Sequence, residues 1–294
     1  MYGRFFITGL PRTGTGWLMS MLDSITGVTC YGESKLFSGQ SEECPALYAS
    51  IQTGIDQWAR FIACRRHNVF DSDDAIKTIG HENYVHGFIL DAVVQDMTTL
   101  LMRAAVRDLL PNDGPGIYGD KTPMFYPDEL DNLLRTVPSA LVIILQRNVY
   151  NWVRSWALFY YQRRIDRAAE WRYACFDDED FYRIHRYLNN KSARLLTPKT
   201  LTNLVNIWHE FQSHADTLAD RKNIITYKYE QMQSDPKPLL RQFAEAMQIE
   251  ISEAEIDDVV NRYPPIKKDI PPLSDNEMQI IETALKGRES CPGQ

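Results

Sequence analysis

The sequence lacks any long hydrophobic run. Its longest plainly apolar stretch, residues 140–145, is far shorter than the roughly 20 residues that a helix needs to cross a membrane. Met1 lies only a few residues before the first apolar segment, and no export signal is visible there. The sequence therefore predicts a protein without a membrane anchor.

Cysteine and histidine are also scarce. The five cysteines are odd in number and include no C-x-x-C pair, which favours a reducing compartment and a cytoplasmic location. They are Cys30, Cys44, Cys64, Cys175 and Cys291. The six histidines form no H-E-x-x-H motif or comparable cluster, so we expect neither a structural nor a catalytic metal.

Basic residues are in the minority. The formal net charge of −7 argues against a nucleic-acid-binding surface, although it leaves room for a small basic pocket. The 294 residues can bury one substantial core, and no glycine-, serine- or proline-rich tract separates two halves. We therefore predict a single domain over residues 1–294, with helical and aromatic insertions around residues 34–110 and 160–200.

The most informative segment that is present is G-L-P-R-T-G-T-G at residues 9–16. It has the glycine spacing of a phosphate-binding loop, but Thr15 stands where the lysine belongs and Gly16 where the magnesium-binding hydroxyl belongs. The preceding apolar run, residues 4–8, predicts a strand, and residues 17–22 predict a helix. Unpaired N–H groups at the start of that helix favour a bound anion.

Arg12 adds a permanent positive charge to this loop, which suits an anionic group. The alternative is an ordinary glycine-containing turn between a strand and a helix. A nucleotide or small-molecule kinase is a second alternative, but it requires a lysine at position 15.

Strands and helices alternate along the chain. Strands are predicted at residues 4–8, 27–30, 116–119, 140–146 and 223–227. Helices are predicted to begin at residue 17 and to span residues 127–134, 149–164 and 201–218. A last helix is predicted to begin at Asp235-Pro236. This order predicts an α/β protein with three layers, in which helices flank a central parallel sheet.

One further helix is predicted from its amphipathic pattern, and one segment is expected to be irregular. The apolar face of the helix is expected to form a wall of the core, and its residues are Leu90, Val93, Val94, Met97, Leu100, Leu101, Ala104 and Ala105. The acidic run D-D-E-D at residues 177–180 is interpreted as a solvated turn.

Ligands in such sheets bind beyond the carboxyl ends of the strands, so the residues after each strand are informative. Arg147 could bind a phosphate with two hydrogen bonds, with the Ser155 hydroxyl as a second donor. Arg12, the loop amides and Lys121 could surround a second anionic centre, and Glu33 is the carboxylate placed to accept a proton. Taken singly, each has a simpler interpretation as a surface ion pair, a helix hydroxyl bonded to its own backbone, or a solvated loop residue.

Together these segments resemble the PAPS-dependent sulfotransferases. F-I-T-G-L-P-R-T-G-T at residues 6–15 resembles the loop that holds the 5′-phosphosulfate, and I-I-L-Q-R-N at residues 143–148, continued to Ser155, resembles the 3′-phosphate segment. G-D-K-T-P at residues 119–123 and I-T-Y-K-Y-E-Q-M at residues 225–232 are similar to two further family segments. The resemblance implies the P-loop-NTPase-like sulfotransferase fold, with PAPS as cosubstrate and PAP as product.

The resemblance also implies roles for individual residues. C-Y-G-E at residues 30–33 is similar to the segment of protein-tyrosine sulfotransferases in which a glutamate is the base, so Glu33 takes that role here. Arg12 and Lys121 would stabilise the sulfuryl group and the leaving phosphate. The residues implied to bind the cosubstrate are Pro11, Arg12, Thr13, Gly14, Thr15, Gly16, Trp17, Arg147, Ser155 and Tyr229.

Two features depart from the family pattern. Val149 stands where many members have proline. Lys286-Gly287-Arg288 only weakly resembles the family's C-terminal R-K-G-x-x-G motif. The sequence therefore does not identify which C-terminal residues cover the 3′-phosphate.

The expected function is metal-free, in-line transfer of a sulfuryl group from PAPS to a hydroxyl or amine of a small-molecule acceptor. The two insertions would form the acceptor side. The alternatives are a kinase-like nucleotide-binding protein and a scaffold without catalytic activity. The sequence does not identify the acceptor or the oligomeric state.

Overall fold

The computed structural model describes residues 3–34, 36–37, 47–66, 84–110, 116–124, 126–166, 176–190, 195–265 and 272–289. Within these ranges, only the backbone is described for residues 57–66, 84–93, 190 and 288–289.

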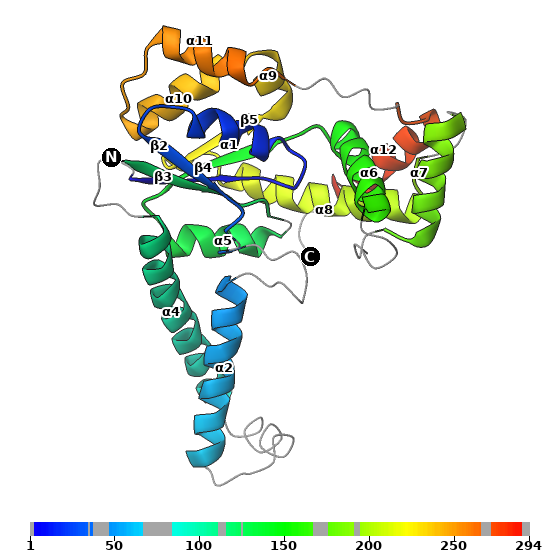
Figure 1. Cartoon of the computed structure of the whole chain (residues 1–294). Helices are drawn as coiled ribbons and strands as arrows, with labels where there is room; N and C mark the ends of the chain where they lie inside the picture. The colour runs from blue at the N-terminus through cyan, green and yellow to red at the C-terminus, as the bar shows by residue number, and fades with distance from the viewer. Residues whose placement is uncertain are drawn as a thin grey trace.

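A five-stranded parallel sheet forms the centre of the molecule (Figure 1). Its strands are β1 (Arg4–Thr8), β2 (Val28–Gly32), β3 (Ile117–Lys121), β4 (Leu141–Gln146) and β5 (Ile224–Lys228), in the order β2-β3-β1-β4-β5. The continuous apolar run of β4 has Leu141 to Leu145 fully buried, as expected for a strand that is covered on both faces.

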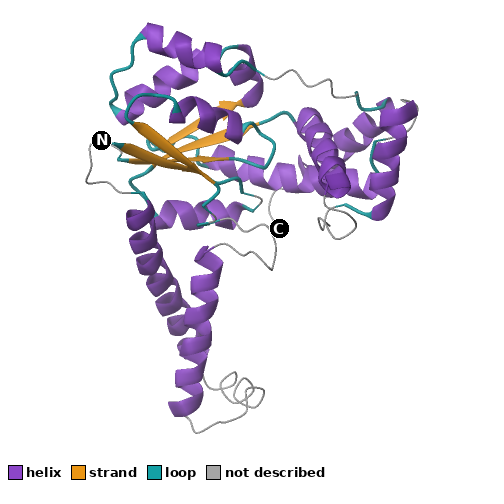
Figure 2. Cartoon of the chain, viewed as in Figure 1, coloured by secondary structure: helices purple, strands orange, loops and turns teal. Residues whose placement is uncertain are grey.

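Helices cover both faces of this sheet (Figure 2). On one face lie α1 (Thr15–Asp23), α9 (Tyr229–Ser234), α10 (Lys237–Met247) and α11 (Glu253–Arg262). On the other lie α5 (Pro127–Thr136) and α8 (Pro198–Thr217). Because side chains alternate along a strand, Phe5 packs in the first layer with Phe243, and Phe6 packs in the second with Leu133. The predicted three-layer fold is confirmed.

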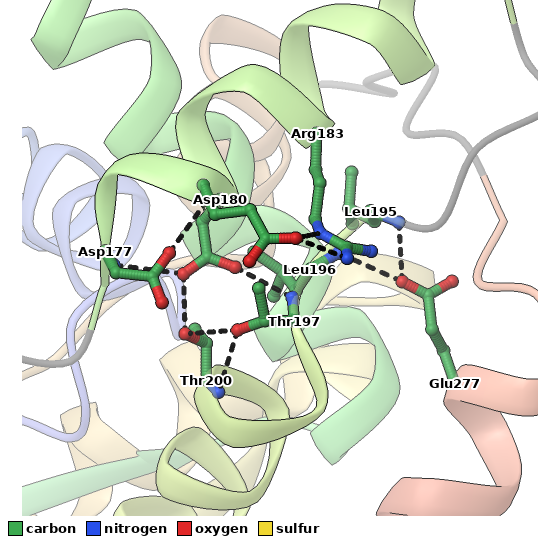
Figure 3. Close-up of polar contacts among 9 residues, drawn as sticks. Asp177, Asp180, Arg183, Leu195, Leu196, Thr197, Thr200 and Glu277 are labelled. Atoms are coloured by element: carbon green, nitrogen blue, oxygen red, sulfur yellow. Dashed lines mark hydrogen bonds and ion pairs between the residues drawn. The ribbon is translucent and has the colours of Figure 1, made fainter.

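A group of helices lies beside the sheet, next to α8 (Figure 1). It consists of α6 (Val149–Asp166), α7 (Asp178–Asn190) and α12 (Asp275–Glu289). Two fully buried carboxylates, Asp180 and Glu277, hold the chain that leads into α8 (Figure 3). Asp180 accepts a hydrogen bond from Thr197 N at 2.8 Å, and Glu277 accepts one from Leu195 N at 2.6 Å. These bonds satisfy backbone donors that would otherwise be buried without partners.

The prediction that residues 177–180 form a solvated turn is wrong. The acidic run begins α7, where Asp180 N donates to Asp177 Oδ1 and Asp177 N donates to Asp180 Oδ2, each at 3.0 Å. This reciprocal pairing occupies donors at the start of the helix in the manner of a capping box. An acidic first turn is also favoured by the helix dipole, so the same letters indicate a helix start.

Two helices, α2 (Leu47–Arg66) and α4 (Tyr84–Leu109), project away from the sheet (Figure 1). The predicted core face of α4 is wrong at Met97, Leu100 and Leu101, which are 37%, 63% and 50% exposed. The buried stripe instead follows Thr98 and Met102 at a spacing of four residues, continuing the line of Val94 and Val106. A projecting helix is contacted along only a narrow stripe, and hydrophobicity alone did not locate it. Leu90 and Val93 lie outside the described side chains.

Other differences concern boundaries and missed helices. The third strand continues past Gly119 through Asp120 to Lys121, and the second continues to Gly32, so their carboxyl ends lie closer to the polar residues than predicted. The sequence did not predict α9, α11 or α12, and it predicted α2 and α7 only as parts of the helical and aromatic insertions, without bounds.

We expect Gly119→Ala to destabilise the fold, because a Cβ at Gly119 would come within 2.2 Å of the fully buried Phe5 ring. Such overpacking costs about 1–3 kcal/mol in the free energy of unfolding, which urea denaturation measures. Gly54→Ala is the control, since Gly54 is exposed in α2 with no atom near its Cβ position, and it should leave stability unchanged or slightly raised. Equal effects of the two substitutions would contradict the packing argument.

Candidate active site

The loop between β1 and α1 depends on backbone conformations that glycine supplies. Gly9 has φ of 139°, and a Cβ there would lie 2.4 Å from the Leu145 carbonyl oxygen. Gly14 caps α1 with φ of 94°. Arg12 lies in the left-handed region at φ of 75°, and the Thr13 hydroxyl donates to the Leu10 carbonyl at 2.7 Å. The loop is therefore held in the compact form that the glycine spacing predicts.

The predicted site residues follow the sheet in the order of its strands. From one edge to the other, the strand ends carry Glu33, Lys121, the loop with Arg12, Arg147 and Tyr229. Neighbouring strands are about 4.8 Å apart, so the row spans about 19 Å. All of these residues lie at the carboxyl ends of the strands, which is the arrangement predicted from the sequence.

Arg147 is fixed against the glycine loop. Its Nη1 donates to the Arg12 carbonyl at 2.7 Å, and its guanidinium carbon lies 4.4 Å from the centre of the Tyr229 ring. The indole of Trp208 in α8 donates to the Arg147 carbonyl at 2.8 Å. The sequence analysis did not identify Trp208, because nothing near position 208 shows that its indole reaches the end of β4.

Arg12 is held from two directions. Its guanidinium carbon lies 4.8 Å from the centre of the Phe159 ring in α6, and the indole of Trp152 donates to the carbonyl of the preceding residue, Pro11, at 2.8 Å. Phe159 was not predicted, and Trp152, which belongs to an aromatic-rich segment suited to an apolar acceptor, was not predicted to contact the glycine loop. The aromatic enrichment of this helix was the only available signal.

Neither Arg12 nor Arg147 forms an ion pair with a described carboxylate, although the charge of Glu230 acts on Arg147 and opposes the lowering of its pKa. Their Nε atoms are buried and without a hydrogen-bond acceptor in the described part of the chain. Burial lowers the pKa of both guanidinium groups, yet arginine stays charged in proteins. Two partly buried cations side by side without ion-pair partners are electrostatically costly, and bound anionic groups would relieve that cost.

Ser155 is buried in α6, and its hydroxyl makes no hydrogen bond to the described residues. It lies four residues before Phe159, so the two share one face of the helix. Since Phe159 reaches Arg12, this face is turned toward the glycine loop. The role of Ser155 as a second phosphate donor beside Arg147 stays a prediction.

Glu33 and Lys121 form an ion pair at adjacent strand ends. The Lys121 side chain is 11% exposed and that of Glu33 is 39% exposed, so the carboxylate is the more accessible partner. Glu33 adopts φ of 52°, and its N–H donates to the Lys121 carbonyl at 2.8 Å. The turn therefore aims the carboxylate at the lysine rather than continuing β2.

Asp120 supports this turn from beneath. It is fully buried in β3, and its Oδ1 accepts a hydrogen bond from Ser34 N at 3.2 Å. Burial raises the pKa of Asp120 to about 6, against the opposing effects of hydrogen bonding by Ser34 and the charge of Lys121. The sequence analysis named no role for Asp120.

The remaining predicted residues lie around the loop. Thr13 and Thr15 are buried, and Gly16 is exposed in the first turn of α1. The Trp17 and Tyr229 rings meet edge to face at 6.3 Å between centroids, and the Trp17 indole donates to the Tyr263 carbonyl at 2.9 Å. Pro11, Gly14 and Arg12 complete the loop. The structure thus brings all predicted residues to one edge, while their roles stay predictions.

No described helix is long and apolar enough to span a bilayer. No three His, Cys, Asp or Glu side chains in the described ranges gather as a metal site, and the expectation of a metal-free protein stays a prediction.

Known proteins share features of this sequence and of this fold. The sequence profile described as "Sulfotransferase family" matches residues 4–253. A sulfotransferase of Mycobacterium avium has a similar solved structure, with 13% identity, coverage of 100% of this chain and 78% of that one, and a TM-score of 0.50. At this identity the likeness shows the fold alone.

Two more distant solved structures were found with PAP bound. A mouse sulfotransferase complexed with PAP has 12% identity, coverage of 94% of this chain and 74% of that one, and a TM-score of 0.43. A retinol dehydratase in complex with androsterone and the inactive cofactor PAP has 13% identity, coverage of 99% and 82%, and a TM-score of 0.46. The comparison with curated proteins gave no match.

Proposed function

The chain belongs to the sulfotransferase family, and on that basis we propose that it transfers a sulfuryl group from PAPS to a hydroxyl or amine of a small-molecule acceptor. The single observation that carries the proposal is the pair of arginines, Arg12 and Arg147, which form no ion pair with the described residues and are fixed at neighbouring strand ends by the hydrogen bond from Arg147 to the Arg12 carbonyl. PAPS carries a 3′-phosphate and a 5′-phosphosulfate, so one arginine is available for each anionic group.

The nucleotide would lie along the row of strand ends. Arg147 and Ser155 bind the 3′-phosphate, and the 5′-phosphosulfate lies against the glycine loop with Arg12. Tyr229 stacks on the Arg147 guanidinium and meets Trp17, so these aromatic rings are placed to contact the adenosine. Pro11, Thr13, Gly14, Thr15 and Gly16 supply the backbone of the cradle.

Transfer requires one bond to form as another breaks. The acceptor oxygen or nitrogen forms a bond to sulfur, the bond between sulfur and the 5′-phosphate oxygen breaks, and PAP leaves with that oxygen. Glu33 accepts the acceptor proton, while Arg12 and Lys121 stabilise the charge that develops on the sulfuryl and leaving oxygens. The proposed mechanism uses no metal, and the whole chain is proposed to act as one domain with the 34–110 and 160–200 insertions on the acceptor side.

A kinase of the same fold class fits less well. Thr15 occupies the position of the phosphate-binding lysine, and Gly16 that of the magnesium-binding hydroxyl. A scaffold without activity is the other alternative, and retention of the Glu33–Lys121 pair beside the arginines argues against it.

Calorimetry with PAP and AMP tests the proposal, because AMP lacks only the 3′-phosphate. We expect PAP to bind about tenfold to a hundredfold more tightly than AMP, which corresponds to one charged hydrogen-bonded phosphate contact. Arg147→Gln should remove that preference while leaving AMP binding nearly unchanged. Arg107→Gln, an equal charge change at an exposed position of α4, is the control. Equal affinity of the parent protein for the two nucleotides would refute the proposal.

A further inference from the structure

One face of α6 continues beyond Phe159 to a further cation. Arg163 lies four residues after Phe159, and its guanidinium carbon is 5.2 Å from the centre of that ring. Arg12 lies over the same ring at 4.8 Å. Two positively charged groups therefore share one aromatic ring. They repel each other, and a bound anion would offset the energy of that repulsion.

Arg163 forms no ion pair with any described residue, in contrast to its neighbour. Arg164 binds Asp178 at 2.7 Å, donates to the Tyr160 hydroxyl at 2.9 Å and lies over the Phe181 ring. The α6–α7 contact thus neutralises Arg164 and leaves Arg163 available. Arg163 is half-buried, so its charge is only partly screened by solvent.

Arg12 contacts or neighbours both other cations, Arg147 and Arg163. The Arg12 carbonyl accepts the hydrogen bond from Arg147, and the Arg12 guanidinium shares the Phe159 ring with Arg163. If Arg147 holds the 3′-phosphate and Arg12 the phosphosulfate, Arg163 lies beside the sulfuryl end, because it shares the Phe159 ring with Arg12. That is the side from which an acceptor must approach for in-line transfer.

We propose that the acceptor carries an anionic group, such as a carboxylate, which Arg163 binds while Phe159 contacts the adjoining apolar part of the acceptor. This inference rests on the proposed sulfotransferase function. Phe159 is in addition a positioning residue, because its ring holds the Arg12 guanidinium.

Two closely related phenols test the inference: 4-hydroxybenzoate, which carries a carboxylate, and its uncharged methyl ester. With saturating PAPS, we expect the parent protein to show the higher kcat/KM for the acid. Arg163→Gln should lower kcat/KM for the acid by about tenfold to a hundredfold and leave the ester within about twofold, as one charged hydrogen-bonded contact predicts. Arg163→Lys should retain part of the preference, and Arg221→Gln, at an exposed position outside both insertions, should retain all of it.

Binding of 4-hydroxybenzoate to the PAP-loaded protein, measured by calorimetry, gives a second readout that needs no turnover. Weaker binding by the Arg163→Gln protein supports the inference even if neither phenol is sulfated. Equal use of acid and ester, or a loss that is the same for both, overturns it while leaving the proposed function intact. Absence of PAP binding and of any transfer would overturn both proposals.

Discussion

Glu33→Gln is expected to lower kcat for sulfuryl transfer by about 10²–10⁴-fold, the usual contribution of a positioned general base. The substitution keeps the size of the side chain and an oxygen that can accept from Lys121. The chain therefore keeps its local contacts but loses the group that takes the acceptor proton. PAP affinity should be unchanged, because Glu33 lies two strands away from the glycine loop in the sheet.

Stopped assays with labelled PAPS and calorimetry with PAP measure these two quantities separately. Glu282→Gln, the same change at an exposed position of α12, controls for the loss of one negative charge. A Glu33→Gln protein that binds PAP and turns over at the parent rate would remove the base role from Glu33. A parallel loss of PAP affinity would instead show that the ion pair with Lys121 organises the nucleotide site.

The sheet edge could be predicted because its signals are local. Glycines at positions 9 and 14 are required by positive φ angles, and the buried run of β4 ends directly before Arg147. Parallel strands then bring their carboxyl ends together without further information. The sequence therefore indicated both the fold and the residues that gather at this edge.

Other features depend on contacts between distant parts of the chain. The indoles of Trp152 and Trp208 support backbone carbonyls 141 and 61 positions away, which no spacing rule reveals. The α4 stripe is set by what covers it, and Asp180 becomes buried because Thr197 and its neighbours need acceptors. Composition showed aromatic and acidic segments here but could not assign their partners.

Burial of Asp120 is expected to make the stability of the folded protein depend on pH. Its pKa is raised from 3.8 to about 6 in the folded protein, so between these values the folded state binds a proton that the unfolded state has lost. Since stability falls with rising pH wherever the folded state holds more protons, this group lowers the free energy of unfolding across that window. A shift of this size corresponds to about 3 kcal/mol, complete by about pH 7.

Asp120→Asn removes this titration and keeps an oxygen to accept from Ser34 N. The stability of the Asp120→Asn protein relative to the parent should therefore rise by about 2 kcal/mol between pH 4 and pH 7, as measured by urea denaturation at each pH. Asp220→Asn, at an exposed position after α8, should give a difference that stays flat over the same range. A flat difference for Asp120→Asn, or one that falls with pH, would show that burial does not govern this carboxyl. The expected rise would instead mean that the turn carrying Glu33 is built on a carboxylate whose burial costs stability at neutral pH, a cost that the Ser34 contact and the charge of Lys121 offset only in part.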